Sequence, residues 1–202
     1  MAATYRFALV GNPNVGKSSL FNALTGLHQH TGNWPGKTVA TAAGTCSIDG
    51  AAVELIDLPG TYSLSARSPE EEVAAEYISF GSADAVIVVC DATALERNLY
   101  LALRVMEITN RVVICVNLMD EAGKRGITVD LPRLSQLLGV RVVGTSARQK
   151  KTLPPLLRAA GAAAQERRRK PVPVRYGEAI EAGLFSIEAR LDELLPGSMP
   201  NH

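Results

Sequence analysis

Residues 11–18 read Gly11-Asn12-Pro13-Asn14-Val15-Gly16-Lys17-Ser18, a complete G-x-x-x-x-G-K-[ST] phosphate-binding loop. The loop follows an apolar, strand-like run at residues 5–10 and precedes a helical pattern at residues 19–24. In such a loop, backbone N–H groups and the N-terminus of the helix point at phosphate oxygens. Lys17 would reach the β- and γ-phosphates, and the hydroxyl of Ser18, which is followed by Ser19, would bind Mg²⁺. The stretch therefore predicts a nucleoside triphosphate site in an α/β domain.

The composition is that of a folded, nearly neutral protein. Of 202 residues, 47% are hydrophobic and 20% are charged, and the net charge is +1, which argues against a disordered chain and against a strongly basic nucleic-acid binder. The three cysteines, Cys46, Cys90 and Cys115, lie far apart and have no metal-ligand spacing. The longest apolar runs, at residues 85–90 and 112–116, are far shorter than the roughly 20 residues of a membrane span. No signal peptide is recognisable, so we expect a soluble, cytoplasmic chain.

Strand-like and helix-like segments alternate along most of the sequence. We expect strands at 5–10, 44–48, 53–57, 85–91, 112–117 and 141–145, and helices at 17–25, 69–80, 94–109, 131–138 and 153–165. An Asp49-Gly50 turn signal makes the second and third strands an antiparallel pair. This order predicts a three-layer P-loop NTPase fold with a six-stranded, mostly parallel sheet that contains one antiparallel strand. Residues 28–41 have no clear periodicity, and we interpret them as a functional loop.

The character of the chain changes after residue 165. A basic run at 167–170 leads into Pro171 and Pro173, and a helical pattern follows at 177–195. The basic run is interpreted as a solvated helix end, with a contact to lipid headgroups or RNA as the alternative. We therefore predict a nucleotide-binding domain at 1–165, followed at 166–202 by a linker and the start of a helical domain.

A second group of motifs supplies metal ligands and selects the base. Asp57-Leu58-Pro59-Gly60 ends the third expected strand, where Asp57 can hold Mg²⁺ and the Gly60 N–H can reach a γ-phosphate; Thr38 would add a hydroxyl to the metal. Asn117-Leu118-Met119-Asp120 follows the fifth strand, and Thr145-Ser146-Ala147 follows the sixth. The Asp120 carboxylate can accept from N1–H and the exocyclic amine of guanine, which adenine does not offer, and such sites discriminate by on the order of 10⁴. The predicted nucleotide is GTP.

Longer strings resemble the cytosolic G domain of FeoB-type bacterial ferrous iron transporters, within the translation-factor-related class of small G proteins. They are Gly32-Asn33-Trp34-Pro35-Gly36-x-Thr38-Val39, Asp57-Leu58-Pro59-Gly60-Thr61-Tyr62-Ser63-Leu64, Ser68-Pro69-Glu70-Glu71, Asp91-Ala92-Thr93-x-Leu95-Glu96-Arg97-Asn98-Leu99-Tyr100-Leu101 and Asn117-Leu118-Met119-Asp120-Glu121-Ala122. The resemblance covers about residues 5–160. It implies a GTPase that gates Fe²⁺ uptake through an attached permease at the bacterial inner membrane. Implied partners are that permease, small accessory proteins and further copies of the chain, with no nucleic acid.

The resemblance also implies a monovalent cation. Asn14 matches an asparagine that binds K⁺ in potassium-activated relatives, and Gly32 and Trp34 match the loop whose carbonyls complete the ion's shell. Gly36, Lys37 and Thr38 would belong to the first switch loop and residues 57–60 to the second. Where many G proteins have a water-orienting Gln after the Gly60 position, this chain has Thr61, and no arginine finger is evident from the sequence. We therefore hypothesise that K⁺ stimulates hydrolysis, with Asn14, Lys17, Thr38 and Gly60 as the catalytic group.

The sequence departs from the family at Lys37 and Ala40, where an apolar and an acidic residue are usual. Leu118 stands where many G proteins outside the family have a lysine. We interpret His28 and His30 as solvated loop residues. Two other functions stay open. One is an RNA- or ribosome-associated G protein of the same fold, which the aromatic content of 5% disfavours. The other is a regulatory module that senses GTP without useful turnover.

Overall fold

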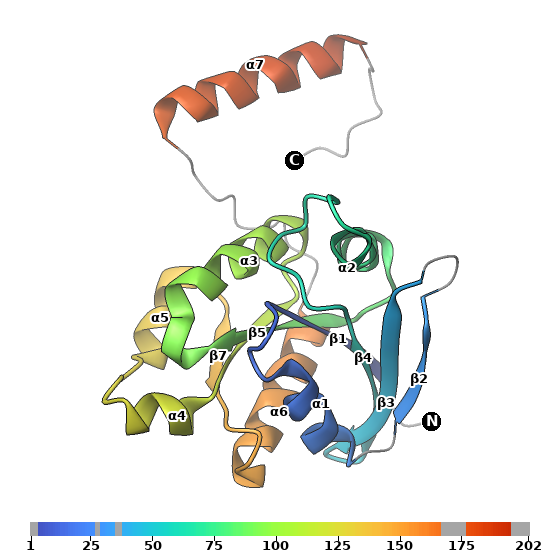
Figure 1. Cartoon of the computed structure of the whole chain (residues 1–202). Coiled ribbons are helices and arrows are strands. Elements are labelled where there is room, and N and C mark those ends of the chain that lie inside the picture. Colours follow the sequence, from blue (N-terminus) through green and yellow to red (C-terminus); the bar gives the residue numbers. More distant parts are fainter. Residues whose placement is uncertain (1–3, 27–28, 35–37, 167–176, 195–202) are drawn as a thin grey trace.

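A seven-stranded sheet forms the centre of the computed structural model, which describes residues 4–26, 29–34, 38–166 and 177–194 (Figure 1). Its order is β2-β3-β4-β1-β5-β6-β7, and only β3 runs against the others. The strands are β1 (Thr4–Gly11), β2 (Gln29–Asn33), β3 (Ala40–Ile48), β4 (Ala51–Asp57), β5 (Ala85–Asp91), β6 (Val112–Asn117) and β7 (Arg141–Gly144). The predicted P-loop NTPase architecture is therefore confirmed.

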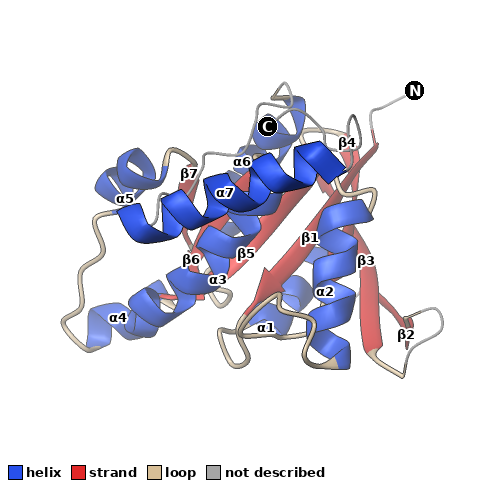
Figure 2. Ribbon diagram, turned by 90° about the horizontal axis from the view of Figure 1, so that it is seen from above, coloured by secondary structure: helices blue, strands red, loops and turns tan. Residues whose placement is uncertain are grey.

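Helices cover both faces of this sheet. These helices are α1 (Lys17–Thr25), α2 (Pro69–Phe80), α3 (Leu95–Ile108), α4 (Met119–Lys124), α5 (Leu131–Leu138) and α6 (Leu153–Gln165), with 3-10 turns η1 (Ala92–Ala94) and η2 (Lys150–Thr152) before α3 and α6. A further helix, α7 (Glu178–Leu194), follows in the chain. Phe7 and Leu9 of β1 face α1 and α6, whereas Ala8 and Val10 face the side covered by α2 and α3 (Figure 2). The alternation along β1 thus builds two apolar cores, one on each face.

The strand number is the main correction to the sequence-based expectation. Residues 29–33, expected to be part of an irregular loop, form β2 at the edge of the sheet, and β3 begins at Ala40 instead of residue 44. An edge strand can form through backbone pairing alone, so the polar sequence of β2 carries no alternating pattern to reveal it. The short helix α4 was also not expected. The predicted Asp49-Gly50 turn between β3 and β4 is confirmed, with φ of 47° and 84° at its two residues.

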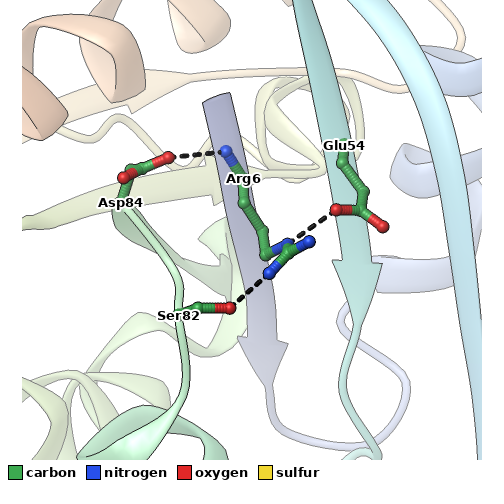
Figure 3. Close-up of polar contacts among 4 residues, drawn as sticks. All are labelled: Arg6, Glu54, Ser82 and Asp84. Carbon is green, nitrogen blue, oxygen red and sulfur yellow. Dashed lines mark hydrogen bonds and ion pairs between the residues drawn. The ribbon is translucent and has the colours of Figure 1, made fainter. Parts of the chain in front are cut away.

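Arg6 ties together the end of the sheet where β1 and β4 begin (Figure 3). Its Nε donates to Glu54 Oε2 at 2.6 Å, its backbone N–H donates to Asp84 Oδ2 at 2.8 Å, and its Nη1 donates to Ser82 Oγ. These contacts fix the loop between α2 and β5 to the two central strands. Because ligands of open α/β sheets bind at the carboxyl ends of the strands, this cluster is structural.

The helix α7 is separated from the three layers (Figure 1). Its Ile180, Leu184, Phe185 and Ile187 are all exposed. The basic run at 167–170 lies outside the described residues, and the proposed boundary near residue 165 stays a prediction. Within the described ranges, no helix is both long and apolar enough to cross a membrane.

Candidate functional site

The loop at residues 11–18 joins β1 to α1 at the carboxyl end of the central strands. A Cβ at Gly11 would lie 2.6 Å from Val89 O, and one at Gly16 would lie 2.7 Å from Asn117 Nδ2. Gly16 has a φ of 79° and Asn14 a φ of 67°, both in the left-handed region. No side chain caps the first turn of α1. The loop is therefore closely seated and offers bare backbone N–H groups, as an anion cradle requires.

Lys17 and Asp57 form a largely buried ion pair below this cradle, with 9% and 12% of the two side chains exposed. The Lys17 ammonium donates to Asp57 Oδ1 and, at 2.5 Å, to Leu58 O. Burial raises the pKa of the Asp57 carboxyl, and the Lys17 charge opposes that effect. Ser18 is exposed beside them. The Ser18 hydroxyl and the Asp57 carboxylate are hard oxygen donors, so these two residues fit a Mg²⁺ ion.

The segment 57–60 lies directly on the phosphate-binding loop. Leu58 N–H donates to Leu9 O at 3.0 Å and Thr61 N–H to Gly11 O at 3.1 Å. A Cβ at Gly60 would lie 3.5 Å from the backbone of Pro13. The four residues of this motif are thus brought together with the loop, as expected from the ends of neighbouring strands β4 and β1.

Asn117 connects three loops through its buried amide. Its Nδ2 donates to Val15 O at 3.0 Å, and its Oδ1 accepts from Thr145 Oγ1 at 3.1 Å. Thr145 is held in turn by its N–H to Val116 O at 2.8 Å, and its carbonyl accepts from Met119 N–H at 3.1 Å. Asn117 therefore braces these loops against one another. Because the amide is fully buried, it fixes the loops after β6 and β7 to the phosphate-binding loop.

Asp120 stands in the first turn of α4, next to the loop that carries Ser146 and Ala147. The Ser146 hydroxyl lowers the pKa of the Asp120 carboxyl. Leu118, just before α4, has a φ of 60°, and its side chain lies against Gly16. This arrangement presents an ionised acceptor and leaves an apolar side chain where a lysine is usual.

The first switch loop is not assembled with these groups. Thr38 is exposed beyond the end of the β2–β3 ladder, and β3 and β4 separate β2 from β1. Gly32 lies on β2 in open space. Trp34 packs edge-to-face on Tyr77, with ring centroids 5.3 Å apart. Gly36, Lys37 and His28 lie outside the described residues.

Three hydrogen bonds in the segment 63–71, which follows the second switch loop, were not anticipated. Glu71 accepts from Ser63 Oγ at 3.0 Å and from Arg67 N–H at 3.1 Å. Ser68 Oγ caps α2 by accepting from Glu71 N–H at 3.2 Å. The Ser68-Pro69-Glu70-Glu71 string carries a helix-start signal, which could have indicated this cap.

Comparisons with known proteins agree on one family. The family model for FeoB_N, "Ferrous iron transport protein B", matches residues 5–160. The Fe(2+) transport protein A/Fe(2+) transporter FeoB fusion protein of Porphyromonas gingivalis is 41% identical over 200 residues, which are 96% of this chain and 24% of that relative. The chain thus spans about a quarter of the length of this curated relative.

Solved structures of the cytosolic domain of the T. maritima FeoB iron transporter have the same fold. The apo form superposes with a TM-score of 0.89 at 40% identity, covering 95% of this chain and 75% of that one. The GMPPNP form gives a TM-score of 0.88 at 40% identity, with 94% and 75% covered.

Proposed function

The chain belongs to the FeoB N-terminal family of ferrous iron transport proteins, and we propose that it binds GTP with Mg²⁺, hydrolyses it, and thereby gates Fe²⁺ uptake by an attached permease. The observation that carries this proposal is the Asn117 amide, which joins the phosphate-binding loop to the two loops that would hold guanine. A relative solved with GMPPNP supports the choice of nucleotide. In the whole protein, this domain would act at the cytoplasmic face of the bacterial inner membrane.

Binding of the phosphates would change the partners of Lys17. Its ammonium would leave Asp57 and Leu58 O for the β- and γ-phosphates, and the bare N–H groups of residues 14–18 would donate to the same anion. Ser18 and the released Asp57 would hold Mg²⁺, and Thr38 would join them after its loop moves. The metal neutralises charge on the phosphates when bound. The Gly60 N–H would donate to the γ-phosphate.

Guanine would be read by the loops that Asn117 fixes. Asp120 would accept from the base N1–H and the exocyclic amine, and a backbone N–H at Ala147 would donate to the guanine carbonyl oxygen. The lowered pKa of Asp120 keeps this acceptor ionised. Leu118 would cover the base without a charge, which predicts modest affinity and quick exchange.

The K⁺ hypothesis gains support from Thr61. Its hydroxyl donates to Ser63 O at 2.7 Å and only 3% of the residue is exposed, so it is not directed at an attacking water. A cation held by Asn14 and by the carbonyls of Gly32 and Trp34 would supply positive charge at the phosphates instead. Asn14 is exposed in the phosphate-binding loop, where its amide can reach such an ion.

Two measurements test the proposal. Calorimetry with Mg²⁺ should show binding of GTP and GDP but not ATP, and Asp120→Ala should lose the guanine nucleotides; equal binding of ATP would refute the assignment. Phosphate release should be faster in KCl than in NaCl, and Asn14→Gly should remove the difference. Equal turnover in both salts would refute the K⁺ site, and no turnover in either would favour a GTP-sensing module.

A further inference from the structure

An aromatic contact holds the Thr38 loop at the edge of the sheet. β2 pairs with β3 from Gln29 opposite Gly44 to Asn33 opposite Ala40, and Trp34 N–H continues the ladder by donating to Val39 O at 2.8 Å. The Trp34 ring then meets Tyr77 of α2 at an interplanar angle of 84°. This geometry is the favourable edge-to-face arrangement of two aromatic rings.

Tyr77 is itself well fixed. Its carbonyl accepts from Gly81 N–H at 2.8 Å at the end of α2. Its hydroxyl hydrogen-bonds with Ser82, whose Oγ also accepts from Arg6 Nη1 (Figure 3). The ring that receives Trp34 is therefore tied to the central strands β1 and β4 through Arg6 and Glu54.

The ladder and the proposed metal site compete for the same residues. Thr38, Gly32 and Trp34 would all have to approach the phosphate-binding loop, yet two strands separate β2 from β1. Val39, the last residue of the ladder, is three residues beyond Ala42, the partner of Asp57, or about 10 Å along an extended strand. In this arrangement Thr38, one residue further along, is thus displaced from Asp57.

We propose that Tyr77 is a positioning residue for the first switch loop. By packing on Trp34, it holds that loop against α2 and so opposes the movement of Thr38 to the metal that GTP binding requires. The proposal rests on the proposed function, because it assumes that GTP draws Thr38 to the metal. The apparent affinity of a ligand falls by the fraction of protein that is competent to bind it. GDP has no γ-phosphate to recruit Thr38, so the contact weakens binding of GTP analogues alone.

Trp34 is the only tryptophan in the sequence, so its fluorescence reports on this contact directly. Adding GMPPNP and Mg²⁺ to the wild-type protein in KCl should shift the emission to longer wavelength, whereas GDP should not. Tyr77→Leu should show the shifted emission before any nucleotide is added. It should bind GMPPNP about two- to tenfold more tightly, the range expected for one aromatic pair, with GDP affinity unchanged.

Two variants serve as controls. Tyr77→Phe keeps the ring and should behave as wild type, which separates the ring contact from the Ser82 hydrogen bond. Tyr100→Leu removes an exposed tyrosine of α3 and should change neither the emission nor the affinities.

Calorimetry on the same samples tests the role of Tyr77 separately from the proposed function of GTP binding. If GMPPNP binds but the wild-type emission stays unchanged, or if Tyr77→Leu alters GMPPNP and GDP affinity equally or not at all, the role of Tyr77 is overturned and the proposed function stands. If neither nucleotide binds, the proposed function fails first. The wild-type measurement needs no variant. An unchanged emission on GMPPNP binding therefore overturns the role of Tyr77 even if Tyr77→Leu does not fold.

Discussion

Replacing Lys17 by alanine should destabilise the protein through Asp57, and the loss should grow with pH. The Lys17 ammonium is the cationic partner of a carboxylate that is 12% exposed. In the Lys17→Ala protein, that carboxylate would lie below the phosphate-binding loop with no opposing charge. Removing one partner of a fully buried pair costs about 3–5 kcal/mol. Because this pair retains some access to water, we expect about 2–3 kcal/mol, which lowers Tm by roughly 4–12 °C for a chain of this length.

The pH dependence follows from the direction of the Asp57 shift. Burial raises the pKa of Asp57 above 3.8, and Lys17 opposes this, so removing Lys17 raises the folded pKa further. Well below pH 4 the carboxyl is protonated in both the folded and unfolded chains, and Lys17 contributes little. As pH rises from there through the folded pKa, the unfolded chain releases its proton first, and the variant loses stability.

Thermal unfolding without nucleotide and with a chelator, at pH 5 and at pH 8, measures this effect. The Tm of Lys17→Ala should fall further below that of the wild type at pH 8 than at pH 5. The double variant Lys17→Ala with Asp57→Asn should recover most of the lost Tm, because no unpaired charge remains. Lys124→Ala, on an exposed lysine of α4, is the matched control and should change Tm little. An equal loss at both pH values, or no recovery in the double variant, would refute the reasoning.

Three further outcomes are expected. Asn117→Ala should lower the free energy of unfolding by about 1–3 kcal/mol in denaturant titrations, because it removes the donor to Val15 O and the acceptor of the Thr145 hydroxyl, which keeps only its contact with Cys115 Sγ. Asp120→Asn should weaken GTP binding by about 10- to 100-fold in calorimetry and improve binding of xanthosine triphosphate, whose C2 carbonyl accepts where guanine donates. Arg6→Ala should cost only about 1 kcal/mol or less in the same titration, since its pair with Glu54 is 42% and 35% exposed.

Most of the sheet could be predicted because its inner strands carry strong local signals. β5 and β6 are buried along nearly their whole length, and their bounds in the structure are the predicted ones. β2 could not be predicted, because its polar sequence carries no alternating pattern and its strand form rests on backbone pairing with the distant β3. α4 is a short helix inside a loop whose motif signals an interaction with a ligand and not a secondary structure.

In the candidate site, too, some contacts could be predicted from the sequence and others could not. Asn117 and Thr145 follow strands that lie side by side, so their meeting follows from the order of the sheet. The position of Thr38 depends instead on where Trp34 finds a partner, and Tyr77 is distant in the sequence. No spacing rule joins a switch-loop tryptophan to the far end of α2, so this contact required the three-dimensional structure.

The left-handed backbone at Asn14 has a consequence for how this family can vary. A φ of 67° is comfortable for glycine and tolerable for asparagine, and it strains most other side chains. Substitution at this position should therefore alternate chiefly between Asn and Gly, and a change to Gly keeps the loop but deletes the amide. In an alignment of related GTPases, glycine here should accompany glutamine at the Thr61 position, and asparagine should accompany its absence. Covariation between the positions of Asn14 and Thr61 would show that, in different lineages, either a bound cation or a glutamine side chain serves the same step of hydrolysis.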